Sequence, residues 1–423
     1  MSSSQPIQIV IVGGSWAGIA VINQLLSPFR WSKKTIQVTL IERNDSRHNT
    51  LGAFRALVDA DYGDKIWIPY NNIFPKDAAH KVIQDSLAQV YHHHIVLESG
   101  STVAFDYLVL CTGCNNPVPG KFSSFSSSAK AVELTTKIRQ DLIKSKNVAV
   151  IGGGCSGVEL AGEIKTTFPQ KQVTLIHSTS TLIDYPEFTE AVKHLALSHL
   201  EELGVQIVLN ERAVIEELDH DHPIHVGAKT IRTKSGKTIE SDMQFLAAGV
   251  RTDTSYMSTL KPQGVDDFDP ASLVDPETRV IKVQKTLQLA DEAFPYIFAV
   301  GDCTDFSKIA LATTSFATGQ VAAKNILKLI DASASSSCSD IHAANKTVKL
   351  NQGWSRPEIT VLTTGPRTGI SNMPLFGTLF NNFFSRLVMS EDVMLRRIMR
   401  DMSITPIEAE TIRLEMSEGS LKQ

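Results

Sequence analysis

Two stretches of the chain share one pattern, in which a continuous apolar run breaks into glycines and then into apolar residues at helical spacing. The first is "IQIVIVGGSWAGIAVINQLL" (7–26), and the second is "NVAVIGGGCSGVELAGEI" (147–164). Each apolar run predicts a strand buried in a parallel sheet. Glycines between such a strand and a helix predict a tight turn that holds a pyrophosphate at the helix N-terminus. The chain is therefore expected to bind two dinucleotides.

In the first unit, Ser15 stands where a third glycine is usual. Serine is the smallest polar substitute, and its hydroxyl can donate a hydrogen bond to a phosphate oxygen. The next apolar run, "TIQVTLIER" (35–43), ends in Glu42, which is placed to accept hydrogen bonds from ribose hydroxyls. The residues predicted to contact this dinucleotide are Gly13, Gly14, Ser15, Trp16, Ala17, Gly18, Glu42 and Arg43.

The second unit has glycines at 152, 154 and 157, and its next strand, "KQVTLIHS" (171–178), ends at His177 instead of an acid. An acid at this point binds the 2′-hydroxyl of NADH and repels the 2′-phosphate of NADPH. A histidine removes that repulsion, so if this unit binds a nicotinamide nucleotide we expect both forms to be accepted. The predicted contacts of this unit are Gly152, Gly154, Gly157 and His177.

Three further apolar runs end in turns: "FDYLVLCTG" (105–113), "MQFLAAGVRTDT" (243–254) and "YIFAVGDCTD" (296–305), the last followed by a helical pattern over 310–327. Their order predicts an α/β fold with one three-layer, Rossmann-like domain nested inside another. The predicted divisions are 1–118 and 250–332 for the first dinucleotide-binding domain, 119–249 for the inserted second one, and 333–423 for a linker and a C-terminal α/β segment. The turns add Thr112, Gly113, Gly249, Gly301 and Asp302 to the predicted cofactor contacts.

Composition narrows the function classes. The 423 residues are 42% hydrophobic and 20% charged, and the net charge of −4 argues against a nucleic-acid partner. No apolar run reaches the ~18 residues that span a membrane. The N-terminus runs directly into the first strand, and the five cysteines are odd in number and scattered, so we expect a reducing, cytoplasmic setting.

Two other chemistries are disfavoured. Cys111 and Cys114 have the spacing of a redox motif, but Cys111 ends a buried strand and Gly113 belongs to the following turn. The histidine-rich stretch 91–98 has no accompanying cysteines or acidic cluster, so no metal site is expected.

These residues resemble the pyridine-nucleotide-dependent flavoprotein oxidoreductases with two dinucleotide domains. Within that group they are most similar to the apoptosis-inducing-factor-like, mitochondrion-associated branch that includes the ferroptosis suppressor protein. The segments that carry the resemblance are "RHNTLGAFRALVDADYGDKIWIPY" (47–70), "GGGCSGVELAGEIKTTFPQKQVTLIHS" (152–178), "VGDCTD" (300–305) and "LTTGPRTGISNMPLFG" (362–377).

The resemblance implies FAD in the first unit, NADH or NADPH in the second, and a quinone as electron acceptor. It implies an FAD contact for Arg55, a contact near the adenine for Ile83, and a catalytic position for Glu159 near the nicotinamide, although Glu159 as a simple helix cap stays open. Disulfide reduction is disfavoured, because residues 43–70 lack the cysteine pair of the related disulfide reductases. Two alternatives also stay open: a flavin enzyme acting on a small metabolite of a biosynthetic pathway, and a redox-sensing or cell-death signalling flavoprotein.

The C-terminal region has an apolar stripe at helical spacing, followed by Arg396, Arg397 and Arg400. Such a helix suits peripheral membrane contact over 375–400, at mitochondria or another membrane, where a lipid quinone would be met. It equally suits packing on the flavin domain or on a second subunit of a homodimer. Residues 331–340 are expected to form a flexible linker. The stripe consists of Leu375, Phe376, Leu379, Phe380, Phe383, Phe384, Leu387 and Val388.

Overall fold

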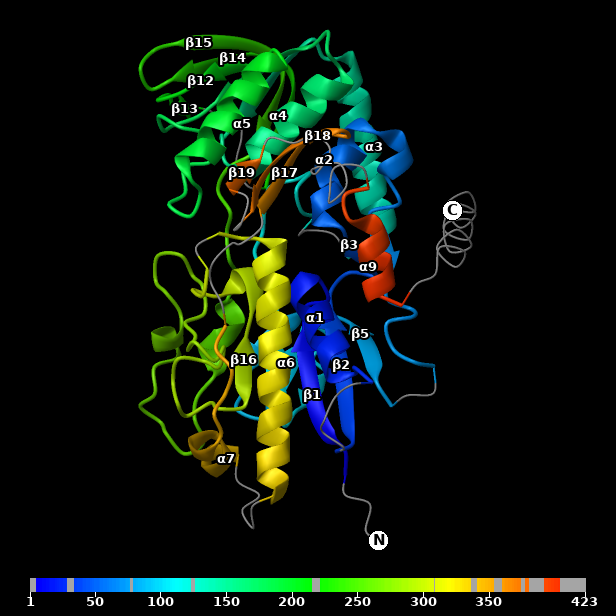
Figure 1. Ribbon diagram of the computed structural model, residues 1–423, viewed down its shortest axis with the longest axis vertical. Coiled ribbons are helices and arrows are strands. Elements are labelled where there is room, and N and C mark those ends of the chain that lie inside the picture. Colours follow the sequence, from blue (N-terminus) through cyan, green and yellow to red (C-terminus); the bar gives the residue numbers. More distant parts are fainter. Residues whose placement is uncertain are drawn as a thin grey trace.

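The computed structural model describes residues 5–28, 34–76, 79–122, 126–214, 221–307, 309–335, 341–353, 360–373, 377–379 and 392–403. Two sheets, one parallel and one mainly parallel, organise these residues, and each is flanked by helices (Figure 1). The expected α/β class with nested Rossmann-like units is confirmed. The domain boundaries at residues 118, 249 and 332 stay predictions.

The first sheet combines two distant stretches of the chain. All its neighbouring strands are parallel. Because the last strand in sequence returns beside the 105–113 run, the sheet brackets the inserted second sheet. In spatial order its strands are β16 (Ile297–Ala299), β9 (Tyr107–Leu110), β1 (Ile7–Val12), β2 (Ile36–Glu42) and β5 (Lys81–Gln84).

Helices α1 (Trp16–Leu25) and α6 (Ala312–Ser335) lie side by side against this sheet (Figure 1). A Cβ on Gly319 of α6 would lie 2.4 Å from the Ala17 carbonyl oxygen, so glycine permits this close approach. The helix predicted over 310–327 is present as α6, which spans Ala312–Ser335 and so extends beyond the predicted end. The predicted linker is wrong over 331–335, because those residues continue α6; adding a residue to an existing helix is easier than nucleating one.

The second sheet carries four parallel strands and an antiparallel extension. Its helices are α3 (Ser128–Lys144), α4 (Cys155–Thr167) and α5 (Glu190–Glu202). Thr189 caps α5, since its side chain accepts a hydrogen bond from the Val192 N–H. The strand order is β12 (Gln206–Val208), β11 (Gln172–Ile176), β10 (Asn147–Ile151), β15 (Thr238–Leu246), β14 (Ile224–Thr233) and β13 (Ala213–Val214).

Smaller elements fill the space around the two sheets. Along the chain, helix α2 lies between the two strands of an antiparallel pair, β3 and β4, and a three-stranded antiparallel sheet follows β5. In order, these elements are β3 (Ser46–His48), α2 (Ala53–Val58), β4 (Trp67–Pro69), β6 (Leu87–Val90), β7 (His94–Leu97), β8 (Thr102–Ala104) and α7 (Ile341–Thr347).

The C-terminal segment forms the antiparallel strands β17 (Thr360–Gly365), β18 (Thr368–Met373) and β19 (Gly377–Leu379), followed by α9 (Leu395–Asp401). Leu379 of the predicted apolar stripe thus ends a strand instead of lying in a helix, and the other seven members lie outside the described residues. The membrane contact of 375–400 and the homodimer stay predictions. Among the helices described, none is long and apolar enough to cross a membrane.

Candidate functional site: a cavity between two glycine turns

A cavity of about 480 Å³ opens at the carboxyl ends of the first sheet's strands. Its wall begins with the first glycine turn, includes Thr112, Gly113, Gly301 and Asp302, and reaches the start of α4 and strand β17. Ligands of open parallel sheets bind at this edge. The predicted contacts that line it are Gly13, Gly14, Ser15, Trp16, Ala17, Glu42, Arg43, Thr112, Gly113, Glu159, Gly301 and Asp302.

The first turn leaves no room for side chains. Gly13 has φ +102°, and a Cβ there would lie 2.3 Å from the Cys111 carbonyl oxygen. A Cβ on Gly14 would lie 2.7 Å from the Tyr70 hydroxyl, which donates a 3.0 Å hydrogen bond to the Gly14 carbonyl. The backbone is therefore bare where a pyrophosphate would approach the N-terminus of α1.

Glu42 ties the end of β2 to this turn. One carboxylate oxygen accepts a 2.6 Å hydrogen bond from the Gly14 N–H, and the other accepts two 3.0 Å hydrogen bonds from Asn44. Glu42 is thereby held on the cavity wall in the position from which an acid binds ribose hydroxyls.

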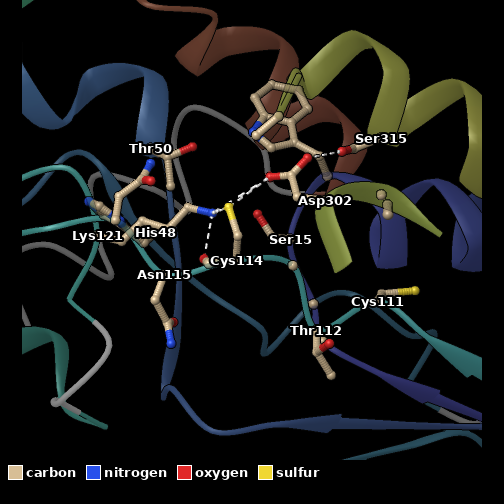
Figure 2. A pocket seen from close by; sticks show the side chains of 18 of the residues that line it. Ser15, His48, Thr50, Cys111, Thr112, Cys114, Asn115, Lys121, Asp302 and Ser315 are labelled. Atoms are coloured by element: carbon tan, nitrogen blue, oxygen red, sulfur yellow. Dashed lines mark hydrogen bonds and ion pairs between the residues drawn. The ribbon is translucent and has the colours of Figure 1, made fainter. Parts of the chain in front are cut away.

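A second group of polar side chains gathers around Asp302 (Figure 2). Ser315 Oγ donates to one of its carboxylate oxygens at 2.9 Å, and the Cys114 thiol lies 3.4 Å from the other. Lys121 Nζ lies 3.7 Å from Asp302 and donates to the Cys114 carbonyl at 2.8 Å. Burial raises the pKa of Cys114 to about 11, so its sulfur stays a neutral thiol at neutral pH.

Aromatic rings form part of the cavity wall. His48 stacks on Trp67 with ring centroids 4.4 Å apart, and Phe122 packs edge-on against His48 at 5.4 Å. Burial, aided by the Lys121 charge, lowers the pKa of His48 to about 3, so the imidazole is neutral. Uncharged, flat surfaces of this kind suit a flat aromatic ligand.

Several buried polar atoms around the cavity lack a partner within the described part of the chain. They include the ring nitrogens Nε1 of Trp16 and Trp67 and Nε2 of His48, together with the Asn116 side-chain oxygen. Buried polar groups are normally hydrogen-bonded, so these atoms indicate a bound molecule with its own donors and acceptors. With the bare glycine turn and Glu42, they fit FAD.

The second glycine turn reaches the same cavity through the first residues of α4. Cys155, Ser156 and Glu159 line the wall, whereas the predicted residues Gly152, Gly154, Gly157, His177 and Gly249 do not. A Cβ on Gly157 would lie 1.8 Å from the Gly152 carbonyl oxygen, and Gly152 has φ +114°. This turn is as tight as the first, which suits a second dinucleotide directed toward the first.

Glu159 is held by the C-terminal strand β17. Its Oε1 accepts hydrogen bonds from the Thr363 N–H at 3.1 Å and the Thr363 hydroxyl at 3.4 Å. A Cβ on Gly162 would lie 2.8 Å from Thr364 Cα, so glycine lets β17 lie this close to α4. Burial raises the pKa of Glu159 to about 8, against the lowering effect of the Thr363 hydrogen bonds, so its carboxyl is mostly protonated at pH 7.

Three further predicted contacts do not line the cavity. Arg55 lies in α2 and forms a two-pronged ion pair with Glu163 of α4, at 2.8 and 2.6 Å, instead of facing the cavity. Ile83 pairs with Ile41 across the sheet, and Gly18 packs against the Gly13 carbonyl. The predicted flavin contact of Arg55 stays a prediction.

Sequence reasoning missed much of the wall. Lys121 and Phe122 follow the β9 turn, and His48 and Trp67 come from β3 and β4. Their signal was weak, because no spacing rule links residues that meet only after folding. The aromatic residues within the quoted segment 47–70 were the available hint.

The family model for pyridine nucleotide-disulphide oxidoreductases matches residues 7–322. Ferroptosis suppressor protein 1 of Xenopus laevis is 30% identical over 334 residues, which cover 77% of this chain and 82% of that protein. Apoptosis-inducing factor homolog A of Dictyostelium discoideum is 26% identical over 404 residues, or 92% of this chain and 90% of that protein.

Solved structures share the fold. The sulfide:quinone oxidoreductase of Aquifex aeolicus superposes with a TM-score of 0.68 at 16% identity, covering 94% of this chain and 91% of that one. NDH2 of Plasmodium falciparum in complex with NADH gives a TM-score of 0.62 at 13% identity, covering 96% of each chain.

Because the family model matches residues 7–322, the chain belongs to the pyridine nucleotide-disulphide oxidoreductase family, and it is an oxidoreductase that uses FAD and NAD(P)H.

Proposed function

We propose that the protein passes electrons from NADH or NADPH, through FAD, to a quinone. One observation carries this choice of acceptor: the Glu159 carboxyl lines the same cavity as the apolar side chains of Leu311, Val361 and Leu362, where burial raises its pKa to about 8 and favours its protonated form at neutral pH. Reduction of a quinone to a hydroquinone takes up two electrons and two protons. An apolar wall with one protonated carboxyl suits such a neutral acceptor.

The names of related proteins support this choice. The Aquifex aeolicus structure is that of a sulfide:quinone oxidoreductase, and it shares the fold over nearly the whole of this chain. The family name also suggests a disulfide as the acceptor, but the cysteines of the chain do not support that choice. Cys111 and Cys114 are free and buried within the described residues, and Cys111 lies apart from Cys114 in Figure 2.

The residues around the cavity then have distinct roles. The first turn and Glu42 would hold the nucleotide part of FAD, and the second turn would bring the nicotinamide nucleotide to it. Bound FAD supplies the chemistry, since a flavin takes a hydride and releases electrons to an acceptor. The chain positions the two nucleotides, keeps water from the buried wall, and holds a proton on Glu159.

The test is anaerobic stopped-flow mixing of the FAD-bound protein with NADH and, separately, NADPH. Flavin absorbance is followed, and a short-chain quinone is then added. We expect rapid bleaching with both nucleotides and rapid recovery with the quinone.

Two other outcomes contradict parts of the proposal. Bleaching that the quinone does not reverse would refute the quinone and favour a metabolite acceptor, or a sensing role in which the reduced state itself matters. Absence of bleaching with both nucleotides would refute the whole electron route.

A further inference from the structure

The two glycine turns are braced by the same hydrogen bond, made by different residue types. In the first unit, the Glu42 carboxylate accepts from the Gly14 N–H at 2.6 Å. In the second, Nδ1 of His177 accepts from the Gly153 N–H at 3.0 Å. The imidazole therefore replaces the acid both at the end of the second strand and as the acceptor that braces the turn.

The hydrogen bonds also define which ring nitrogen carries the proton. Nδ1 accepts from an amide, so it has no proton. The Thr179 hydroxyl donates to the Thr181 carbonyl at 3.0 Å, so its oxygen is left to accept from His177 Nε2 at 2.9 Å. His177 is thus a neutral imidazole with its proton on Nε2.

The surroundings of His177 balance two effects. Burial lowers its pKa, while Asp184 in the following loop raises it. Asp184 Oδ1 lies 3.6 Å from Lys193 Nζ of α5, and this positive charge weakens the effect of Asp184 on the pKa of His177. Beyond β12, the Glu211 carboxylate is engaged by Ser235 and Lys237, and the Glu211 backbone N–H donates to the His177 backbone carbonyl, not to the ring.

We propose that His177 is a proton-controlled selector between the two nicotinamide nucleotides. While neutral, it braces the turn and neither attracts nor repels a 2′-phosphate. A proton on Nδ1 removes the acceptor for the Gly153 N–H and places a cation at the end of β11, where the 2′ group of a bound nucleotide lies. Preference for the 2′-phosphorylated nucleotide therefore rises as the pH falls. This inference rests on the proposed function, because it assumes that the second turn holds the nicotinamide nucleotide.

The test measures dissociation constants of NAD⁺ and NADP⁺ for the FAD-bound protein over a pH series, using oxidised nucleotides so that the flavin is not reduced. His177→Asn is the matched variant, since its amide oxygen can accept from the Gly153 N–H but does not titrate. The 2′-phosphate also titrates in this range, but equally with both proteins. His225→Asn, on β14, serves as a histidine control.

The change in NADP⁺ preference seen with His177→Asn is the baseline. For the wild type and His225→Asn we expect an additional rise of about five- to tenfold in the preference for NADP⁺ as the pH falls from about 8 to about 5.5, as a charge-assisted contact would give. Parallel pH profiles for wild type and His177→Asn would overturn the selector. Failure of both nucleotides to bind at every pH would overturn the proposed function as well, so the two failures are distinguishable.

A second measurement tests the neutral ring directly. Nitrogen NMR of labelled histidine should show the Nε2–H tautomer of His177 at neutral pH and its loss on acidification. His177→Asp should weaken NADP⁺ binding at least about tenfold while keeping NAD⁺, because it restores the acid of the first unit. Equal binding of both nucleotides to His177→Asp would contradict the assigned position.

Discussion

Single glycines of the same backbone conformation have different roles in this chain. Gly13 and Gly100 have φ values of +102° and +84°, but a Cβ on Gly13 would strike the Cys111 carbonyl, whereas Gly100 has open space around it. Alanine at either site incurs the left-handed backbone cost of about 1–2 kcal/mol. Only at Gly13 would the added methyl group also force the first glycine turn to move away from the Cys111 carbonyl.

We therefore expect Gly13→Ala to weaken FAD binding at least about tenfold, or about 1.4 kcal/mol. Gly100→Ala should retain full FAD and lose only thermal stability. Flavin absorbance per protein, with calorimetry for stability, measures both. Full flavin content in Gly13→Ala would show that the turn does not need a bare backbone.

A second single residue, Glu159, is expected to make the reoxidation of the flavin depend on pH. With a pKa of about 8, it holds its proton below that pH and loses it above. Reoxidation of the reduced flavin by quinone should therefore slow as the pH rises through about 8, and Glu159→Gln should remove that inflection. Stopped-flow reoxidation across a pH series measures it, and an unchanged inflection in Glu159→Gln would assign the titration to another group.

Thr363→Val is the matched positioning variant, since it removes the hydroxyl donor but keeps the backbone N–H. The hydroxyl stabilises the ionised carboxylate, so its loss should move the inflection upward by less than about 1 pH unit, given about 0.5–1.5 kcal/mol for a hydrogen bond. A downward shift would contradict this role.

Between elements, helices α2 and α4 are joined by the ion pair of Arg55 and Glu163, whose side chains are 2% and 1% exposed. Removing one partner leaves a buried charge, which typically destabilises by about 3–5 kcal/mol. Arg55→Met should lower the free energy of unfolding by that amount, and Arg55→Met with Glu163→Met should recover most of it. Denaturant titrations of the holoprotein test this, and equal losses in single and double variants would show that the pair is not coupled.

Local patterns predicted the elements better than their meeting points. The strands, glycine turns and Glu42 follow from short-range spacing, and they lie where expected. The ion pair of Arg55 with Glu163 was not predicted, because the two residues lie 108 positions apart along the chain and only folding brings them together. The serine-rich end of α6 suggested a linker by composition, but helix continuation from the preceding turns prevailed.

At the scale of the whole molecule, one cavity draws on widely separated parts of the chain. Its wall includes the first glycine turn, the region around Asp302, the start of α4 at Glu159, and β17 at Leu362. A ligand bound only by the folded state stabilises it in proportion to the logarithm of its concentration over the dissociation constant. FAD bound in this cavity would contact surfaces that unfolding separates, so its stabilisation should extend to both sheets.

Removing FAD should therefore lower the midpoint of thermal unfolding, and adding it back should raise the midpoint again. The free energy of unfolding should rise by about 4 kcal/mol at a thousandfold excess of free FAD over the dissociation constant. Hydrogen exchange should show stronger protection on α4 and β17 as well as on β1, because residues of all three elements line the cavity wall. Protection confined to the first sheet would mean that the cavity does not couple the two units, and the hydride route between them would then need a closing movement.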